Sequence, residues 1–278
     1  MNLKDIQNKK KTYEIVILIS GFFAVITFIL IATPMYRPAT FYIPFLLLIF
    51  VGIIIVLSFS YKSLSKEYKE KYVKETIESL IEDGVFDAKK GFSAEEVFQR
   101  KIIKKESKFQ SEDFMSGKID GRTFKSSDVK IVRVQSNGKT TTSVTTFLGR
   151  FFEIDLDKTY HHPIYIMPNR QSLYRAEKDE KKVDLEYIEF NKTFDVFSRS
   201  PQDIFLLLKP RLMEKLLEFS KSHSNVRYAL IGKKLFVAIH TGNDTFDLKF
   251  LKPIDQSYIQ EVKDEIRFMT DIISLLNI

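Results

Sequence analysis

The sequence predicts an α+β fold: two N-terminal transmembrane helices, a helical stalk, and a mainly antiparallel β-sheet domain with packed helices. Three observations predict it. Two long uncharged apolar runs stand near the N-terminus, helical periodicity follows them, and short β-rich runs alternate with turn residues further on. We expect a basic N-terminus, a transmembrane hairpin, a stalk and an α+β domain, at residues 1–12, 13–61, 62–110 and 111–278.

The apolar runs are long enough to form a membrane hairpin. The first covers residues 15–33 and the second 41–61, and each has no charged residue. About 20 apolar residues in a helix cross a bilayer core. The short loop PMYRPA joins them. A cleaved signal peptide is the competing interpretation of the first run. The run is too long for the apolar part of a typical signal peptide, and a second span follows directly, so a membrane helix is favoured.

Charge predicts the orientation of this hairpin. The flanks are rich in lysine, whereas the loop has only Arg37; the flanking lysines are Lys4, Lys9, Lys10, Lys11, Lys62, Lys66, Lys69 and Lys71. By the positive-inside rule both termini face the cytoplasm. We therefore expect a multi-pass protein of the cell (inner) membrane with a cytoplasmic domain.

Helical periodicity continues from residue 62 and predicts a stalk that ends near Gly84. A capping box at Ser93 and Glu96 predicts a second helix. The charged surface of the stalk is typical of a solvated helix face. A surface that contacts lipid or a partner is the alternative.

Residues 111–200 predict an antiparallel sheet. Within it, Gly138-Lys139-Thr140 resembles the end of a P-loop, but Arg133 stands where a P-loop needs glycine, and the residues that follow favour a strand. We predict a hairpin with Asn137-Gly138 as a type I′ turn. A second hairpin is predicted around Gly232-Lys233.

Three helices complete the predicted domain. One begins at the N-cap Ser200 followed by Pro201, and the next restarts at Pro210. The last helix has an apolar seam that packs on the protein's own sheet or, alternatively, forms a homo-oligomer: Ile259, Val262, Ile266, Met269, Ile273 and Leu276.

Several segments resemble a bacterial, membrane-anchored family of the domain of unknown function 3137 type. They are GKIDGRTFKSSDV at 117–129, FLGRFFEIDL at 147–156, the FDVFS segment and the LLLKPRLMEKLLEF helix. The resemblance spans about residues 105–278. It implies N-terminal membrane spans and the predicted architecture, but no activity and no catalytic residues.

The sequence yields no catalytic, cofactor-binding or metal-ligating residue that we assign. The absence of cysteine excludes disulfides, zinc–thiolate sites and iron–sulfur clusters. Glu153, Asp155 and Asp157 share one strand face, which fits a solvated edge better than a metal site. His161-His162 fits a loop, since neighbouring strand residues point to opposite sides. Asp120 fits a turn, and Asp128 a backbone-ordering role.

Composition disfavours nucleic-acid binding, because residues 111–278 carry 26 basic against 24 acidic side chains. We expect the lipid bilayer and a protein partner or lipid headgroup as partners, in a binding, regulatory or assembly role. The alternative is a membrane-associated enzyme acting on a lipid or envelope substrate. A channel or transporter ranks last, since the spans offer few polar groups.

Overall fold

The structure is a computed structural model, and it describes residues 2–33, 42–169, 179–223, 225–254 and 257–276. The chain forms two compact units. The first contains Met1–Val73 with Phe246–Gln256, and the second contains Lys74–Thr245 with Ser257–Ile278. The predicted loop at 34–39, including Arg37, lies outside the described residues.

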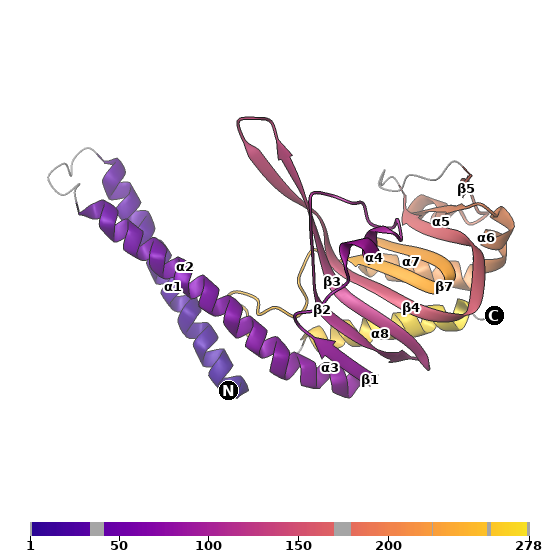
Figure 1. Cartoon of the computed structure of the whole chain (residues 1–278), viewed down its shortest axis with the longest axis horizontal. Coiled ribbons are helices and arrows are strands. Elements are labelled where there is room, and N and C mark those ends of the chain that lie inside the picture. The colour runs from indigo at the N-terminus through magenta and orange to yellow at the C-terminus, as the bar shows by residue number, and fades with distance from the viewer. Residues whose placement is uncertain (1, 34–41, 170–178, 224, 255–256, 277–278) are drawn as a thin grey trace. The chain divides into compact units, whose positions relative to one another are not determined.

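The first unit is built on two antiparallel helices, α1 (Leu3–Ala32) and α2 (Ile43–Tyr68), which lie side by side (Figure 1). A capping box of Asn2 and Asp5 starts α1. Phe23 and Phe50 stack between the helices with ring centroids 5.5 Å apart. Both helices are long and apolar enough to cross a membrane, and only 11% and 0% of their apolar windows are buried in the protein. They therefore differ from buried core helices and suggest a membrane anchor.

The stalk predicted after the second span is helical as far as Leu80. A π-helical turn, η2 (Lys69–Val73), follows α2, and α3 (Lys74–Leu80) follows η2. The helix ends before Gly84, which lies instead in the strand β1 (Glu82–Asp87). The helix predicted at Ser93 exists with its capping box, but it spans only α4 (Ala94–Phe98).

The second unit contains a seven-stranded antiparallel sheet of order β1-β2-β3-β4-β6-β5, with β7 paired to β4. Its other strands are β2 (Lys108–Ile119), β3 (Arg122–Ser136), β4 (Thr141–Pro168), β5 (Lys181–Val183), β6 (Phe194–Ser198) and β7 (Val226–His240). The long β4 is the centre of this sheet. One of its edges pairs with β3 and then β6, while β7 follows the other edge. The predicted antiparallel sheet is thus confirmed.

One turn differs from the sequence prediction in detail. The β3–β4 hairpin is present, but its loop is four residues long, because Ser136 pairs with Thr141. Only Gly138 has a positive φ there, and the Asn137 side chain accepts the N–H groups of Lys139 and Thr140. The loop is therefore an Asx-type turn, and the type I′ prediction is wrong.

The hairpin predicted around Gly232-Lys233 is confirmed. Residues 226–240 are assigned together as β7, but the chain folds back on itself, because the N–H of His240 donates to the Asn225 carbonyl at 3.4 Å. Gly232 lies at the turn with a φ of 62°. The two arms of β7 pair with different stretches of β4, 234–240 with 149–155 and 228–230 with 164–166.

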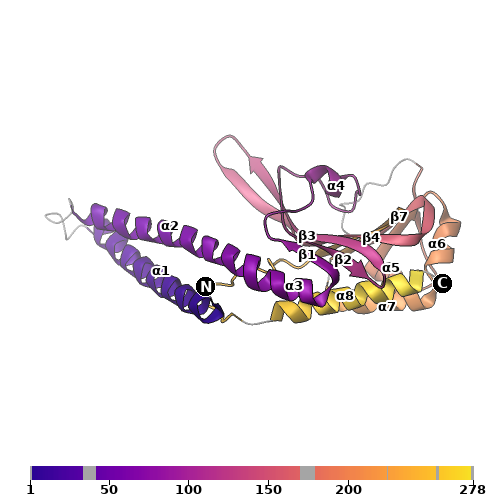
Figure 2. The same cartoon turned by 60° about the horizontal axis from the view of Figure 1, so that its bottom comes forward.

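Helices cover both faces of the sheet, as Figure 2 shows. They are α4 on one side, α7 (Pro210–Ser222) and α8 (Ser257–Leu276) on the other, and α5 (Ile188–Thr193) and α6 (Pro201–Leu207) beside β6. Ser200 caps α6 as predicted. The helix α5 lies in a segment that we predicted to be extended.

Each sheet face has its own buried apolar layer. Phe151 and Val129 belong to the core cluster that includes Val97 of α4. The seam of α8 is buried inside this unit at Val262, Met269 and Ile273. The structure therefore has the first of the two predicted alternatives, in which the seam packs within the chain. The Leu276 side chain lies outside the described residues.

Candidate functional site

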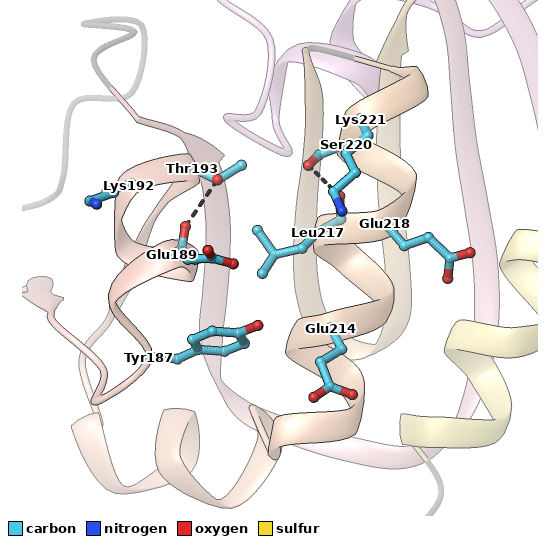
Figure 3. Close-up of a pocket in the computed structure, with 9 residues that line it drawn as sticks. All are labelled: Tyr187, Glu189, Lys192, Thr193, Glu214, Leu217, Glu218, Ser220 and Lys221. Atoms are coloured by element: carbon cyan, nitrogen blue, oxygen red, sulfur yellow. Dashed lines mark hydrogen bonds between the residues drawn. The ribbon is translucent and has the colours of Figure 1, made fainter.

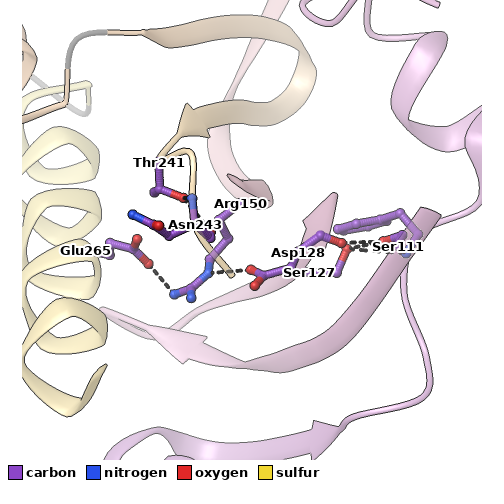
Figure 4. Close-up of polar contacts among 8 residues, drawn as sticks. Ser111, Ser127, Asp128, Arg150, Thr241, Asn243 and Glu265 are labelled. Atoms are coloured by element: carbon purple, nitrogen blue, oxygen red, sulfur yellow. Dashed lines mark hydrogen bonds and ion pairs between the residues drawn. The ribbon is translucent and has the colours of Figure 1, made fainter. Parts of the chain in front are cut away.

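A charged cluster lies inside the second unit, on the face of the sheet that packs against α8. Arg150 of β4 is 1% exposed. Its Nε lies 3.2 Å from Oδ1 of Asp128, its cross-strand partner on β3. Glu265 of α8 binds the same guanidinium from the other side (Figure 4). One buried cation therefore ties two strands and a helix together.

The charge on Arg150 is maintained by its partners. Burial by itself lowers the pKa of the guanidinium, but attraction to Glu265 and Asp128 outweighs burial, so the pKa lies above its ordinary value. The group therefore stays protonated. Its removal leaves buried carboxylates uncompensated, which is costly.

Two further carboxylates approach this cluster. Asp113 sits at a β-bulge of β2 with a φ of 58°, and Asp244 follows β7. Oxygens of Asp113, Asp128 and Asp244 lie within 4.8 Å of one another. These are ligands that Mg²⁺ and Ca²⁺ prefer. The guanidinium already neutralises Asp128, however, so a divalent cation there would meet a fixed positive charge. We interpret the cluster as structural.

A polar cavity of about 320 Å³ lies beside the cluster, and Glu265 belongs to both. The described residues that line it are all polar or ionisable: Ser222, His223, His240, Thr241, Asn243, Thr245, Asp264 and Glu265. Such a lining suits a small polar ligand.

His240 shows what this cavity can do chemically. Its Nδ1 accepts the backbone N–H of Leu148 at 3.1 Å. Burial, with the neighbouring Arg227, lowers its pKa, which favours the neutral ring with the hydrogen on Nε2. His240 thus offers the cavity a donor and no lone pair. The Thr241 hydroxyl donates a hydrogen bond to the Asn243 carbonyl at 2.8 Å. Among the described hydrogen bonds, none joins a nucleophile to a base in this cavity.

An open groove of about 410 Å³ separates α5 from α7 (Figure 3). Tyr187 and Leu217 contribute its apolar surface. The remaining lining residues are polar: Glu189, Lys192, Thr193, Glu214, Glu218, Ser220 and Lys221. The groove thus combines an apolar floor with charges of both signs.

The charges on the two sides of α7 differ in how they are paired. On the α8 side, Lys215 binds Asp271 at 2.8 Å and Glu218 at 3.3 Å. In the groove, no ion pair within the described part of the chain engages Glu189, Lys192, Glu214 or Lys221. These four side chains are therefore available to a ligand.

Exposed apolar side chains gather on the elements that form or precede this groove. Ile188 of α5 is 67% exposed and stands between two groove residues in the sequence. Phe205 and Leu206 of α6 are 55% and 68% exposed, and α6 leads directly into α7. An exposed apolar patch with a polar rim is typical of a protein-binding surface.

The acidic row predicted on β4 is ion-paired. Glu153 and Asp155 share Lys234 of β7, and Asp157 binds Arg122. The solvated-face interpretation therefore fits. The histidine prediction is wrong in part, since His161 and His162 lie within β4 and not in a loop.

The two aspartates of the 117–129 segment have different roles. Asp120 and Gly121 form the two-residue turn between β2 and β3, both at positive φ, as predicted. Asp128 is a buried partner of Arg150, so the predicted backbone-ordering role misses its main contact. Arg150 itself carried a signal in the sequence: it alternates onto the apolar face of Phe152 and Ile154, where a charge requires a partner.

Comparison with known proteins gives a family but no activity. The model of the family described as "Protein of unknown function (DUF3137)" matches residues 145–278, which confirms the resemblance over this part. The 117–129 segment lies outside the match. No curated protein matches the chain.

One solved structure that is similar is the mycobacterial trehalose monomycolate transport factor A, TtfA. The TM-score is 0.39 with 10% identity, over 69% of this chain and 88% of that chain. At this level of similarity, we draw no conclusion from it.

Proposed function

Because residues 145–278 belong to the DUF3137 family, which is described only as of unknown function, we propose a function from the geometry: this domain is a membrane-anchored module that binds a protein partner in the groove between α5 and α7. Its anchor is the pair α1 and α2, with both chain ends in the cytoplasm. The observation that carries the proposal is the groove itself, which has an apolar floor, unpaired charges and exposed apolar neighbours.

The charges favour a polypeptide over a lipid headgroup. The available charges of the groove are balanced, two carboxylates of Glu189 and Glu214 against the two ammonium groups of Lys192 and Lys221, since Glu218 is already paired with Lys215. An anionic headgroup needs an excess of donors and positive charge. A peptide segment with an apolar anchor and charges of both signs satisfies the floor and the rim together.

The alternative of an enzyme draws less support. The polar cavity at His240 is the best candidate for a reaction centre, but its ring presents a donor to the cavity. A general base needs a free lone pair near its substrate. The cavity therefore fits binding of a polar group better than proton abstraction.

Site-specific photo-crosslinking in native membranes tests the proposal. A photoreactive residue is placed at Ile188 or Lys221 in the groove region, and at the exposed positions Lys130 and Lys139 as matched controls. We expect one discrete protein adduct from the groove positions and none from the controls. Identical adducts from all four positions, or lipid adducts alone, would contradict the proposal.

A further inference from the structure

The segment 246–254, which follows β7, binds the ends of α1 and α2 that we propose to face the cytoplasm. All of these contacts lie within the first unit. Glu14, 6% exposed, accepts the backbone N–H of Leu251 at 2.9 Å and the Tyr61 hydroxyl at 3.3 Å. Lys10 pairs with Glu14 and donates to the Lys252 carbonyl at 2.7 Å. The backbone of Leu251 and Lys252 is thus held by two buried charged side chains.

A second set of contacts fixes the start of the segment. Ser65 Oγ lies 2.9 Å from Asp247 Oδ1 and accepts the Leu248 N–H at 3.1 Å. Lys69 pairs with Asp247 at 2.8 Å. Lys10 and Lys69, whose charges help to predict the membrane topology, therefore also hold this segment in place, and they are only 3% and 2% exposed.

The tip of the segment is a tight turn that presents apolar side chains. The Lys252 N–H donates to the Lys249 carbonyl at 3.3 Å, which closes the turn Lys249–Lys252. Leu251 has a φ of 59°, a left-handed conformation that costs a non-glycine residue conformational energy. Such strain persists only where surrounding contacts enforce it, and it often marks functional positions.

The pattern of burial separates this tip from the rest of the segment. Phe246 and Leu248 are buried, whereas Phe250 and Leu251 are 43% and 60% exposed. Exposed lysines flank the exposed pair on both sides, giving the sequence KFLK. The protein therefore holds two apolar side chains outward between two positive charges.

We propose that the turn Lys249–Lys252 inserts Phe250 and Leu251 into the interface of a bilayer that contains anionic lipids. This rests on the proposed anchoring by α1 and α2. Glu14, which binds the turn, and Tyr61, which binds Glu14, lie where the first apolar run (15–33) begins and the second (41–61) ends, so the turn is held at the level of the membrane surface. Apolar groups beside lysines bind such surfaces through burial and attraction to headgroups.

A lipid partner fits better than a protein partner because the exposed pair continues an apolar surface. Ile15 of α1 is 45% exposed and Phe59 of α2 is 71% exposed, and they lie next to Glu14 and two residues before Tyr61 in the sequence. Phe250 contacts Tyr61 with ring centroids 6.0 Å apart. The turn therefore extends the apolar surface that the two helices offer to lipid.

The lack of tryptophan in the chain makes a direct test possible. Full-length Phe250→Trp protein, and separately Leu251→Trp, is reconstituted into phosphatidylcholine–phosphatidylglycerol vesicles with brominated acyl chains. Phe205→Trp, an exposed position of the other unit, is the control. We expect strong quenching and a shift to shorter emission wavelength for the turn variants, with Phe205→Trp unquenched.

Lipid charge gives a second readout. Lys249→Gln with Lys252→Gln, in the Phe250→Trp background, should lose most of the gain in quenching that phosphatidylglycerol gives over phosphatidylcholine alone. Unquenched turn variants in protein that floats with the vesicles would overturn this inference and leave the anchor intact. Protein that does not float with the vesicles would overturn the anchor, and this inference with it.

Discussion

Asp128 and Arg150 are direct cross-strand partners on β3 and β4, and Arg150 Nε lies 3.2 Å from Asp128 Oδ1 in the buried interior. Glu265 reaches the same guanidinium from α8, which is 115 residues further along the chain. The packing of α8 on the sheet therefore depends on a charge network as well as on its apolar seam.

Arg150→Met should lower the free energy of unfolding by about 3–5 kcal/mol, because it leaves Asp128 and Glu265 buried without their cation. Urea denaturation of the full-length protein in detergent measures this. The matched control is Lys118→Met, whose ion pairs with Glu82 and Asp83 are exposed, and its cost should stay below about 1 kcal/mol. An equal loss of free energy of unfolding in the two variants would show that the buried network stabilises the fold no more than an exposed ion pair does.

Gly149→Ala should be strongly destabilising. A Cβ at this position would lie 2.0 Å from the Ile239 carbonyl oxygen in the paired β7, and backbone gives way with difficulty. We expect a loss of about 3 kcal/mol. At Gly232 a Cβ meets open space, so Gly232→Ala should lose only about 1 kcal/mol through its positive φ. Thermal unfolding of both variants decides the order, and the reverse order would refute the close approach of β4 and β7.

His240 should make stability depend on pH. Burial, then Arg227, lowers its pKa in the folded state, so the unfolded state binds the proton more readily. Its contribution is present above about pH 6.5 and is lost as the pH falls through the folded pKa, at up to about 1.4 kcal/mol per pH unit.

Denaturation of wild type and His240→Asn at pH 7.5 and near pH 5 (about 1.5 units below the free His pKa) tests this. The variant should lose less stability on acidification than wild type, while the exposed His161→Asn control should behave like wild type. An unchanged slope in His240→Asn would mean that His240 is not the titrating group.

Charge reversal should separate binding from folding in the groove. Lys192→Glu with Lys221→Glu turns the rim from mixed to wholly acidic and should abolish the crosslink formed at Ile188, with little change in unfolding temperature. Lys130→Glu with Lys139→Glu should leave the crosslink intact. Retention of the crosslink in the groove variant would place the partner elsewhere.

The sequence was most informative where a pattern is local. Uncharged runs, the Ser93 capping box and the Ser200 N-cap predicted elements that the structure contains, because each depends on residues within a few positions. The places of the two turns were also predicted, at Asn137-Gly138 and at Gly232-Lys233, but the type of the first turn was not. The Asn137 side chain accepts two backbone N–H groups, and it closes a four-residue Asx-type loop in place of the predicted type I′ turn.

The candidate site could be predicted only in part. Alternation along β4 puts Arg150 on the apolar face, a signal of a buried partner that our prediction lacked, and its partners Asp128 and Glu265 come from elements whose pairing the sequence does not determine. The groove between α5 and α7 was beyond reach for the same reason. Its two walls are separate helices, and one of them, α5, replaces a predicted strand.

Cysteine accessibility tests the central claim, a membrane-anchored domain on the cytoplasmic side, most directly. The chain contains no cysteine, so single cysteines at Ala39, Lys130 and Lys209 report one position each. In intact cells, a membrane-impermeant maleimide should label only the Ala39→Cys variant, and the other two should react after permeabilisation. Labelling of Lys130→Cys or Lys209→Cys in intact cells would place the domain outside and contradict the account.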